Sequence, residues 1–233
     1  MSAWEQFRHY ITTWSNWTSH SGTHIGILTR LEQHVLLTLV SVAIAAAVAL
    51  PLGLVLGHIG RGGTLAINIT NIGRAIPTFA VLTLLTLSPL GLGYTATAVA
   101  LVLFALPPLV TNSYVGLHEV DPEIRDAARG MGMSGWQLFR RVELPLAVPL
   151  LMAGIRIAAV QVVATATIAA LVGSGGLGRL VVDGLSQNNQ GELLTGAAVV
   201  GALALVVEIT LAVVQRFVDP MRKAKGTPGS ATS

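Results

Sequence analysis

The sequence predicts an all-α membrane protein with about five transmembrane helices. Hydrophobic residues make up 52% of the 233 residues and charged residues only 11%, whereas about a quarter of a soluble protein is charged. The mean hydropathy of +0.69 also favours a bilayer over water. Apolar runs of the length that a spanning helix needs, about 20 residues, recur along the chain. They leave little sequence for a soluble core, so we expect one membrane domain.

Five apolar segments are predicted to cross the membrane. The second is the least regular, because Pro77 interrupts it and removes a helical hydrogen bond. Gly53 and Gly57, in the first, form a small-xxx-small pair that favours close helix packing. The predicted spans are 34–58, 65–88, 94–117, 146–172 and 192–217.

The segments that flank this domain are polar. Residues 1–30 carry Trp4, Trp14 and Trp17, which suit the headgroup level of a membrane, and we expect an external or interfacial segment there. A sixth, weakly apolar span in this region is the alternative. We expect a single transmembrane domain over 31–219, with a cytoplasmic loop at 118–145. The tail 220–233 is turn-rich and polar, which predicts a disordered cytoplasmic end.

Loop charges predict the orientation in the membrane. With five spans, one side receives residues 59–64, 118–145 and the C-terminus, and the Lys and Arg residues there number nine. The opposite side holds three. Since Lys and Arg concentrate in cytoplasmic loops, we expect the C-terminus inside and the N-terminus outside.

The most informative motif is a polar segment with both acidic and basic residues, inside the predicted cytoplasmic loop. Small residues in it let another protein's surface come close, and Gly132 permits a turn that a side chain would strain. Pro145 is suited to the first turn of a new helix. The motif consists of Asp126, Ala127, Ala128, Gly130 and Gly132, then nine residues, then Val142, Leu144 and Pro145.

This spacing resembles the cytoplasmic signature of ATP-binding-cassette (ABC) importer permeases, with Asp126 in place of Glu and Val142 in place of Ile. The resemblance implies a short helix-turn-helix elbow that docks on an ABC ATPase subunit, with Ala127, Ala128 and Gly132 at the contact. The stretch 127–178 further resembles osmoprotectant permeases, which carry glycine betaine, choline or carnitine and have the methionine-type permease fold.

That resemblance implies a non-catalytic subunit of the bacterial cytoplasmic membrane, surrounded by lipid and free of cofactors. Its partners would be the ATPase, a second permease subunit, identical or not, and an external substrate-binding protein. An ABC permease for another solute, such as an amino acid, remains an alternative. An ion-coupled secondary carrier is a third hypothesis, for which only Glu208 offers a titratable group deep in a span.

A glycine-rich stretch follows the fourth span, with Gly173, Gly175, Gly176 and Gly178 in the pattern of a dinucleotide-binding loop. That chemistry requires a strand before the loop and a helix after it in a βαβ unit, whereas here an Ala- and Val-rich span precedes it. We therefore expect a flexible external turn, which either gates the pathway or simply reverses the chain.

Ionisable and polar side chains inside the predicted spans are candidates for a substrate path. Arg156 and Glu208 fall in the inner half of the membrane, and we expect them to pair, because the fourth and fifth spans are antiparallel neighbours. A purely structural role is the alternative. Gln161 and Thr165 share a helical face and either line a path or bond between helices. The full set is Arg74, Arg156, Gln161, Thr165, Thr167 and Glu208.

Other functional classes find no support in the residue pattern. The chain has no cysteine, and its six histidines lack the spacing of a metal site. No phosphate-binding loop of the ATPase type occurs, so ATP hydrolysis would belong to a partner. The net charge of +3 forms no continuous basic stripe, which argues against nucleic acid.

Overall fold

The structure is a computed structural model that describes residues 2–18, 20–21 and 24–219. Two-residue strands β1 (His20–Ser21) and β2 (His24–Ile25) pair antiparallel. A π-helical segment, Phe139–Glu143, and a 3-10 turn, Ala170–Val172, flank α9. The α-helices are α1 (Ala3–Thr12), α2 (Trp14–Thr18), α3 (Ile27–Ile59), α4 (Gly63–Ala75), α5 (Thr78–Thr86), α6 (Tyr94–His118), α7 (Pro122–Gly130), α8 (Gly135–Leu138), α9 (Leu144–Ala169), α10 (Gly178–Ser186) and α11 (Gln190–Val218).

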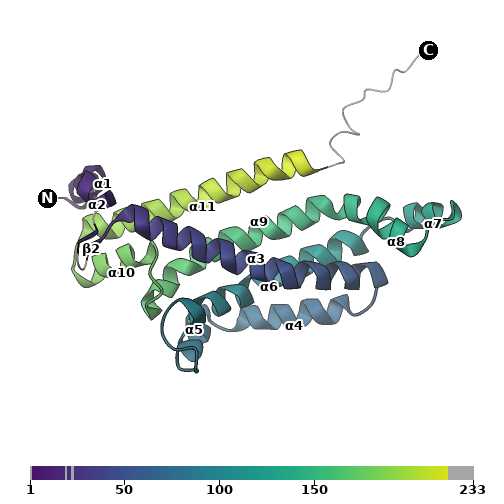
Figure 1. The fold of residues 1–233 in the computed structure, drawn as a ribbon, viewed down its shortest axis with the longest axis horizontal. Helices are drawn as coiled ribbons and strands as arrows, with labels where there is room; N and C mark the ends of the chain where they lie inside the picture. Colours follow the sequence, from purple (N-terminus) through teal and green to yellow (C-terminus); the bar gives the residue numbers. More distant parts are fainter. Residues whose placement is uncertain (1, 19, 22–23, 220–233) are drawn as a thin grey trace, which may run out of the picture.

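The chain runs back and forth along the long axis of the molecule (Figure 1). Helix α3 runs from the end that holds α1, α2 and α10 to the opposite end, α4 and α5 return, and α6, α9 and α11 follow in alternate directions. Helices α7 and α8 lie at the far end, next to the start of α9. Helix α1 and the last residues of α11 therefore lie toward opposite ends of the bundle, as an odd number of passes requires.

Four of the five expected spans are continuous helices. Among the described residues, the helices able by length and composition to cross a membrane are Ile27–Ile59, Tyr94–His118, Gly135–Val172 and Gln190–Val218. The expectation of one span over 65–88 is wrong in detail, because α4 and α5 divide that segment. Ile76 has extended backbone (φ −78°, ψ 127°), the conformation to which a following proline restricts its neighbour. The break at Pro77 thus leaves two short helices in the second pass.

The core lies where α3, α6 and α9 meet. Its largest buried cluster combines Leu37 from α3, Leu101 and Leu109 from α6, and Ala158 and Val162 from α9. Small residues let these helices approach closely.

The predicted role of the glycine pair in α3 is confirmed by the contact between α3 and α6. A Cβ on Gly53 would lie 1.8 Å from Ser113 Oγ, and one on Gly57 would lie 2.8 Å from the Tyr114 carbonyl oxygen. A side chain at either position has no room, so the two glycines set the separation of the two helices.

The N-terminal segment folds into two short helices beside the start of α11. The Gly191 backbone packs so closely on α1 that a Cβ there would lie 2.6 Å from the Gln6 carbonyl oxygen. Burial, with Glu192 nearby, raises the pKa of Tyr10 to about 12. Trp4 and Trp14 stay exposed, at 61% and 72%. Helices α1 and α2, of 10 and five residues, are too short to span a bilayer.

At the other end of the chain, the predicted disordered tail 220–233 lies outside the described residues.

Candidate functional site

The signature segment forms a helix-turn-helix elbow between α6 and α9. The Asp121 side chain accepts a hydrogen bond from the Glu123 N–H (2.8 Å) and caps the start of α7. Gly132 has φ +81°, which confirms the expected glycine turn. Ser134 then caps α8 through a reciprocal pair of bonds with Gln137.

The residues in the first half of the signature are exposed, with one exception. Asp126, Ala127, Gly130 and Gly132 lie at the surface, whereas Ala128 is only 2% exposed. The expectation that Ala128 offers a contact surface to a partner is therefore wrong. Its methyl group is buried and is not available to a partner.

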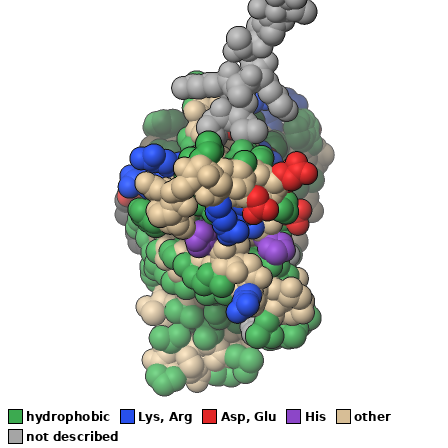
Figure 2. Space-filling model, turned by 90° about the vertical axis from the view of Figure 1, so that its right-hand side faces the viewer, with side chains coloured by type: hydrophobic (Ala, Val, Ile, Leu, Met, Phe, Trp, Pro, Cys, Tyr) green, Lys and Arg blue, Asp and Glu red, His purple; other side chains and the backbone are tan. Residues whose placement is uncertain are grey.

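Apolar side chains that the motif does not include are exposed on the same elbow. Met131 is 72% exposed, Trp136 65% and Ile124 44%. Viewed from this end, the molecule shows acidic, basic and histidine side chains interspersed with apolar ones (Figure 2). Exposed aromatic and Met side chains amid charges are typical of a protein contact surface. Sequence reasoning missed them because it weighed only the signature positions.

The second half of the motif does not begin a separate helix. Pro145 stands at the start of α9, as predicted, but helical structure is continuous from Gly135 to Val172, so α9 is not a separate new helix. The Leu144 N–H donates to the Phe139 carbonyl, five residues back, where the π-helical segment meets α9. Pro145, which has no N–H to donate, stands in the first turn of α9. Val142 and Leu144 lie beside it in the same continuous helix.

Glu143, inside the motif, is the functional candidate that sequence reasoning overlooked. Its side chain is 1% exposed, with Oε2 2.5 Å from His58 Nδ1 and Oε1 3.0 Å from Arg125 Nε. An acid in a run of apolar motif residues was a signal, because a buried carboxylate needs partners. The partners themselves lie 85 and 18 residues away along the chain, beyond any local pattern.

The expected ion pair between α9 and α11 is confirmed. Arg156 Nε lies 3.2 Å from Glu208 Oε1. Arg156 also donates to Gln215 Oε1 (3.3 Å), and the Gln215 amide donates to the Pro149 carbonyl (3.1 Å). These bonds join α11 to α9 at the elbow end, which favours a structural role for both charges over a role in the substrate path.

The remaining intramembrane candidates are spread over the bundle. The Gln161 amide donates to the Phe104 carbonyl of α6 (3.3 Å), so it bonds between helices. Thr165 is half-buried, and the Thr167 hydroxyl is buried without a hydrogen-bond partner among the described residues. Arg74 lies in α4, and its side chain is outside the part of the structure that is described. The structure does not gather these residues into one path.

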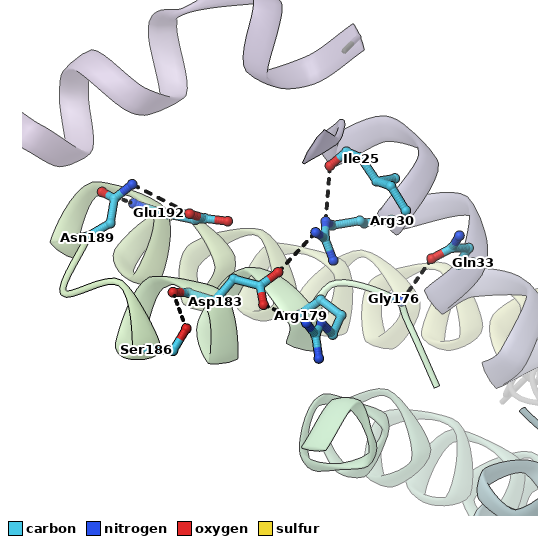
Figure 3. Close-up of polar contacts among 9 residues, drawn as sticks. All are labelled: Ile25, Arg30, Gln33, Gly176, Arg179, Asp183, Ser186, Asn189 and Glu192. Atoms are coloured by element: carbon cyan, nitrogen blue, oxygen red, sulfur yellow. Dashed lines mark hydrogen bonds and ion pairs between the residues drawn. The ribbon is translucent and has the colours of Figure 1, made fainter. Parts of the chain in front are cut away.

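The glycine-rich turn is seated on the start of α3 at the opposite end (Figure 3). Gly173, Gly175 and Gly176 have φ between +74° and +82°, a region in which side chains are strained. The Gly176 N–H donates to Gln33 Oε1 (3.0 Å). Gly178 begins α10, where a Cβ would lie 2.2 Å from the Thr167 carbonyl oxygen. The turn therefore contacts α3 through the Gln33 side chain.

An ionic cluster holds α10 beside that turn. Arg30 Nη2 lies 3.1 Å from Asp183 Oδ2, and Arg179 Nη2 lies 2.8 Å from Asp183 Oδ1. Arg30 Nε also donates to the Ile25 carbonyl (3.1 Å), so the cluster joins α3 to α10 (Figure 3). Sequence reasoning missed α10 and this cluster, although the spacing of Arg179 and Asp183, four residues apart, favoured a helical pair. Among the described residues no group of three metal-ligating side chains occurs.

Comparison with known proteins finds relatives that are all permease proteins of transport systems. The glycine betaine/carnitine/choline transport system permease protein OpuCB of Bacillus subtilis is 34% identical over 83% of this chain and 89% of its own. The carnitine transport permease protein OpuCB of Listeria monocytogenes is 36% identical over 83% and 88%. The osmoprotectant import permease protein OsmY of Salmonella typhimurium is 37% identical over 81% and 80%.

Solved structures share the fold. The MetNI methionine ABC transporter in an inward-facing conformation matches 85% of this chain and 99% of its own, with a TM-score of 0.73 and 25% identity. An amino acid ABC transporter with histidines matches 82% and 92%, with a TM-score of 0.68 and 20% identity. The family described as "Binding-protein-dependent transport system inner membrane component" matches residues 49–223. The fold, the elbow and these relatives agree: the chain belongs to that family of inner membrane permeases of ABC importers.

Proposed function

We propose that this chain is the non-catalytic transmembrane subunit of an ATP-driven importer for a small quaternary-amine solute, such as glycine betaine, choline or carnitine. The curated relatives named above carry solutes of this class. ATP is hydrolysed in a separate subunit, and the elbow over 126–145 passes its motion to the membrane helices.

The elbow is the observation that carries the proposal. It is a capped helix-turn-helix at one end of the bundle, and helical structure continues from its second helix into a membrane span without a break. Trp136 and Met131 supply exposed apolar area of the kind that anchors protein interfaces. A push on such a surface reaches the span directly.

We infer the partners and the orientation from the position of the elbow. The elbow end faces the cytoplasm and an ATPase subunit, and the end with α10 faces outside, where a substrate-binding protein delivers solute. A second permease subunit completes the path. We infer it because the interior of this chain is packed with small and aliphatic side chains over α3, α6 and α9. Lipid covers the remaining apolar surface.

Selectivity resides mainly in the binding protein. Quaternary ammonium groups are recognised by cages of aromatic rings, and aromatic residues form only 5% of this chain. The permease thus acts as a weakly selective conduit, whose substrate is decided by what is delivered to it.

Uptake by the reconstituted complex tests the proposal. Proteoliposomes that contain the permease, its ATPase and its binding protein are loaded with ATP, and entry of labelled glycine betaine, choline and carnitine is measured. Uptake should require internal ATP and persist with a protonophore, and excess methionine or histidine should not compete. Uptake driven by an ion gradient without ATP would contradict it, and competition by an amino acid would overturn the substrate class.

A further inference from the structure

We propose that Glu143 is a positioning residue that fastens the elbow to the ends of α3 and α6, so that all three move as one body. The inference rests on the proposed coupling of the elbow to an ATPase. It concerns how motion of the elbow is passed to α3 and α6, which the signature residues themselves do not explain.

The two oxygens of Glu143 face two different elements. One lies 2.5 Å from His58 Nδ1, in the last turn of α3, and the other 3.0 Å from Arg125 Nε, in α7. Glu143 itself stands in the π-helical segment that leads into α9. A single carboxylate thus joins the first helix of the elbow, the end of the first span and the start of the fourth.

Arg125 extends this connection to α6. Its Nη2 donates a hydrogen bond to the Leu117 carbonyl in the last turn of α6. The Arg125 side chain is 17% exposed, so both of its contacts are shielded from water. Arg125 therefore connects the end of α6 to the buried Glu143 carboxylate.

A stack of rings connects the cluster to the exposed surface of the elbow. Phe139 stacks on Trp136, with ring centroids 5.5 Å apart, and meets the His58 ring edge-on at 5.4 Å. Trp136 is 65% exposed and available to a partner. A displacement of Trp136 therefore acts on His58 through one packed ring, and packed side chains resist compression.

The cluster of Glu143, His58 and Arg125 favours rigid-body motion, because separating its members costs free energy. A buried carboxylate that loses one partner is left uncompensated, so sliding of α7 past α3 is opposed. The π-helical register supports the same conclusion, because π-bulges occur often at functional sites. Here Glu143 is the last residue of the π-helical segment.

Transport per ATP hydrolysed tests the inference. His58→Ala removes one arm of the cluster from a side chain that is 33% exposed, and His58→Gln keeps a group able to donate to Glu143. His118→Ala is the matched control, since His118 is also a histidine at the end of a span, is exposed, and stacks on Tyr114, which is not in the cluster. Because His58 is one of the two partners of the buried Glu143 carboxylate, solute moved per ATP should fall in His58→Ala. His58→Gln should recover part of it, and His118→Ala should match the wild type.

A distance measurement provides an independent readout. The chain has no cysteine, so spin labels can be placed at Ile59 and Glu123, both exposed and outside the cluster. Their separation should stay constant between nucleotide-free and ATP-bound complexes and should vary in Glu143→Gln. A wild-type separation that changes with ATP, or unaltered coupling in His58→Ala, would overturn the inference.

A different variant tests the proposed function independently of this inference. Gly132→Asp disturbs the elbow turn without touching the cluster. If Gly132→Asp uncouples hydrolysis from transport and His58→Ala does not, only the present inference falls. If Gly132→Asp transports normally, the coupling role of the elbow is contradicted as well as the present inference.

Discussion

Replacing Gly53 with alanine should destabilise the contact between α3 and α6. The new Cβ would lie 1.8 Å from Ser113 Oγ and 2.9 Å from the Val110 carbonyl oxygen. The hydroxyl can rotate away, but the carbonyl belongs to the backbone of α6 and cannot, so the helices must separate. Such overpacking typically costs about 1–3 kcal/mol.

Gly201→Ala is the matched control for that substitution. Gly201 lies in α11, where an added Cβ meets nothing within 4 Å. Alanine favours a helix over glycine by about 0.5–1 kcal/mol at either position. This gain cancels when the two variants are compared, so their difference isolates the clash, at about 1–3 kcal/mol.

Reversible unfolding of the purified chain in mixed micelles gives the two free energies. We expect Gly53→Ala to be less stable than Gly201→Ala by the amount of the clash. Equal stabilities would show that α3 and α6 do not approach as closely as the structure has them, and the argument from the two glycines would fail.

Three further predictions concern charged and exposed residues. Glu208→Arg and Arg156→Glu should each lower uptake, and the double reversal should restore more uptake than either single variant; normal uptake by both singles would show that the pair is dispensable. Asp183→Asn should lower the free energy of unfolding by about 1.5–3 kcal/mol, the range for a hydrogen bond to a charged group such as Arg30; an unchanged unfolding transition would contradict this. Trp136→Ala should weaken binding of the ATPase to the solubilised permease about tenfold or more, as for an interface anchor, and an unchanged affinity would remove it from the contact.

Local chemistry explains why much of the fold is predictable from the sequence. Apolar length predicted α3, α6, α9 and α11, because a bilayer demands about 20 apolar residues in a helix. The missing N–H of Pro77 predicted the weak point of the second pass. Gly132 predicted the elbow turn, since its φ of +81° suits glycine.

The rest depends on partners that are distant in sequence. Which face of α7 turns inward is decided by the residues beneath it, so the burial of Ala128 could not be read from the motif. Glu143 meets His58 across 85 residues, and Asp183 meets Arg30 across 153. Hydropathy also overlooked α10, whose nine residues are too few for a span. The Arg156–Glu208 pair was predictable because consecutive antiparallel spans are neighbours.

Crosslinking at the elbow tests the central claim most directly. Single cysteines are placed at Met131, 72% exposed on the elbow, and at Leu92, 78% exposed before α6 at the opposite end. In the assembled complex, the residue-131 cysteine should crosslink to the ATPase with a yield that changes on ATP addition. The residue-92 cysteine should not crosslink to it. Equal yields, crosslinking only from residue 92, or no crosslink from residue 131 would contradict an elbow that couples ATP hydrolysis to transport.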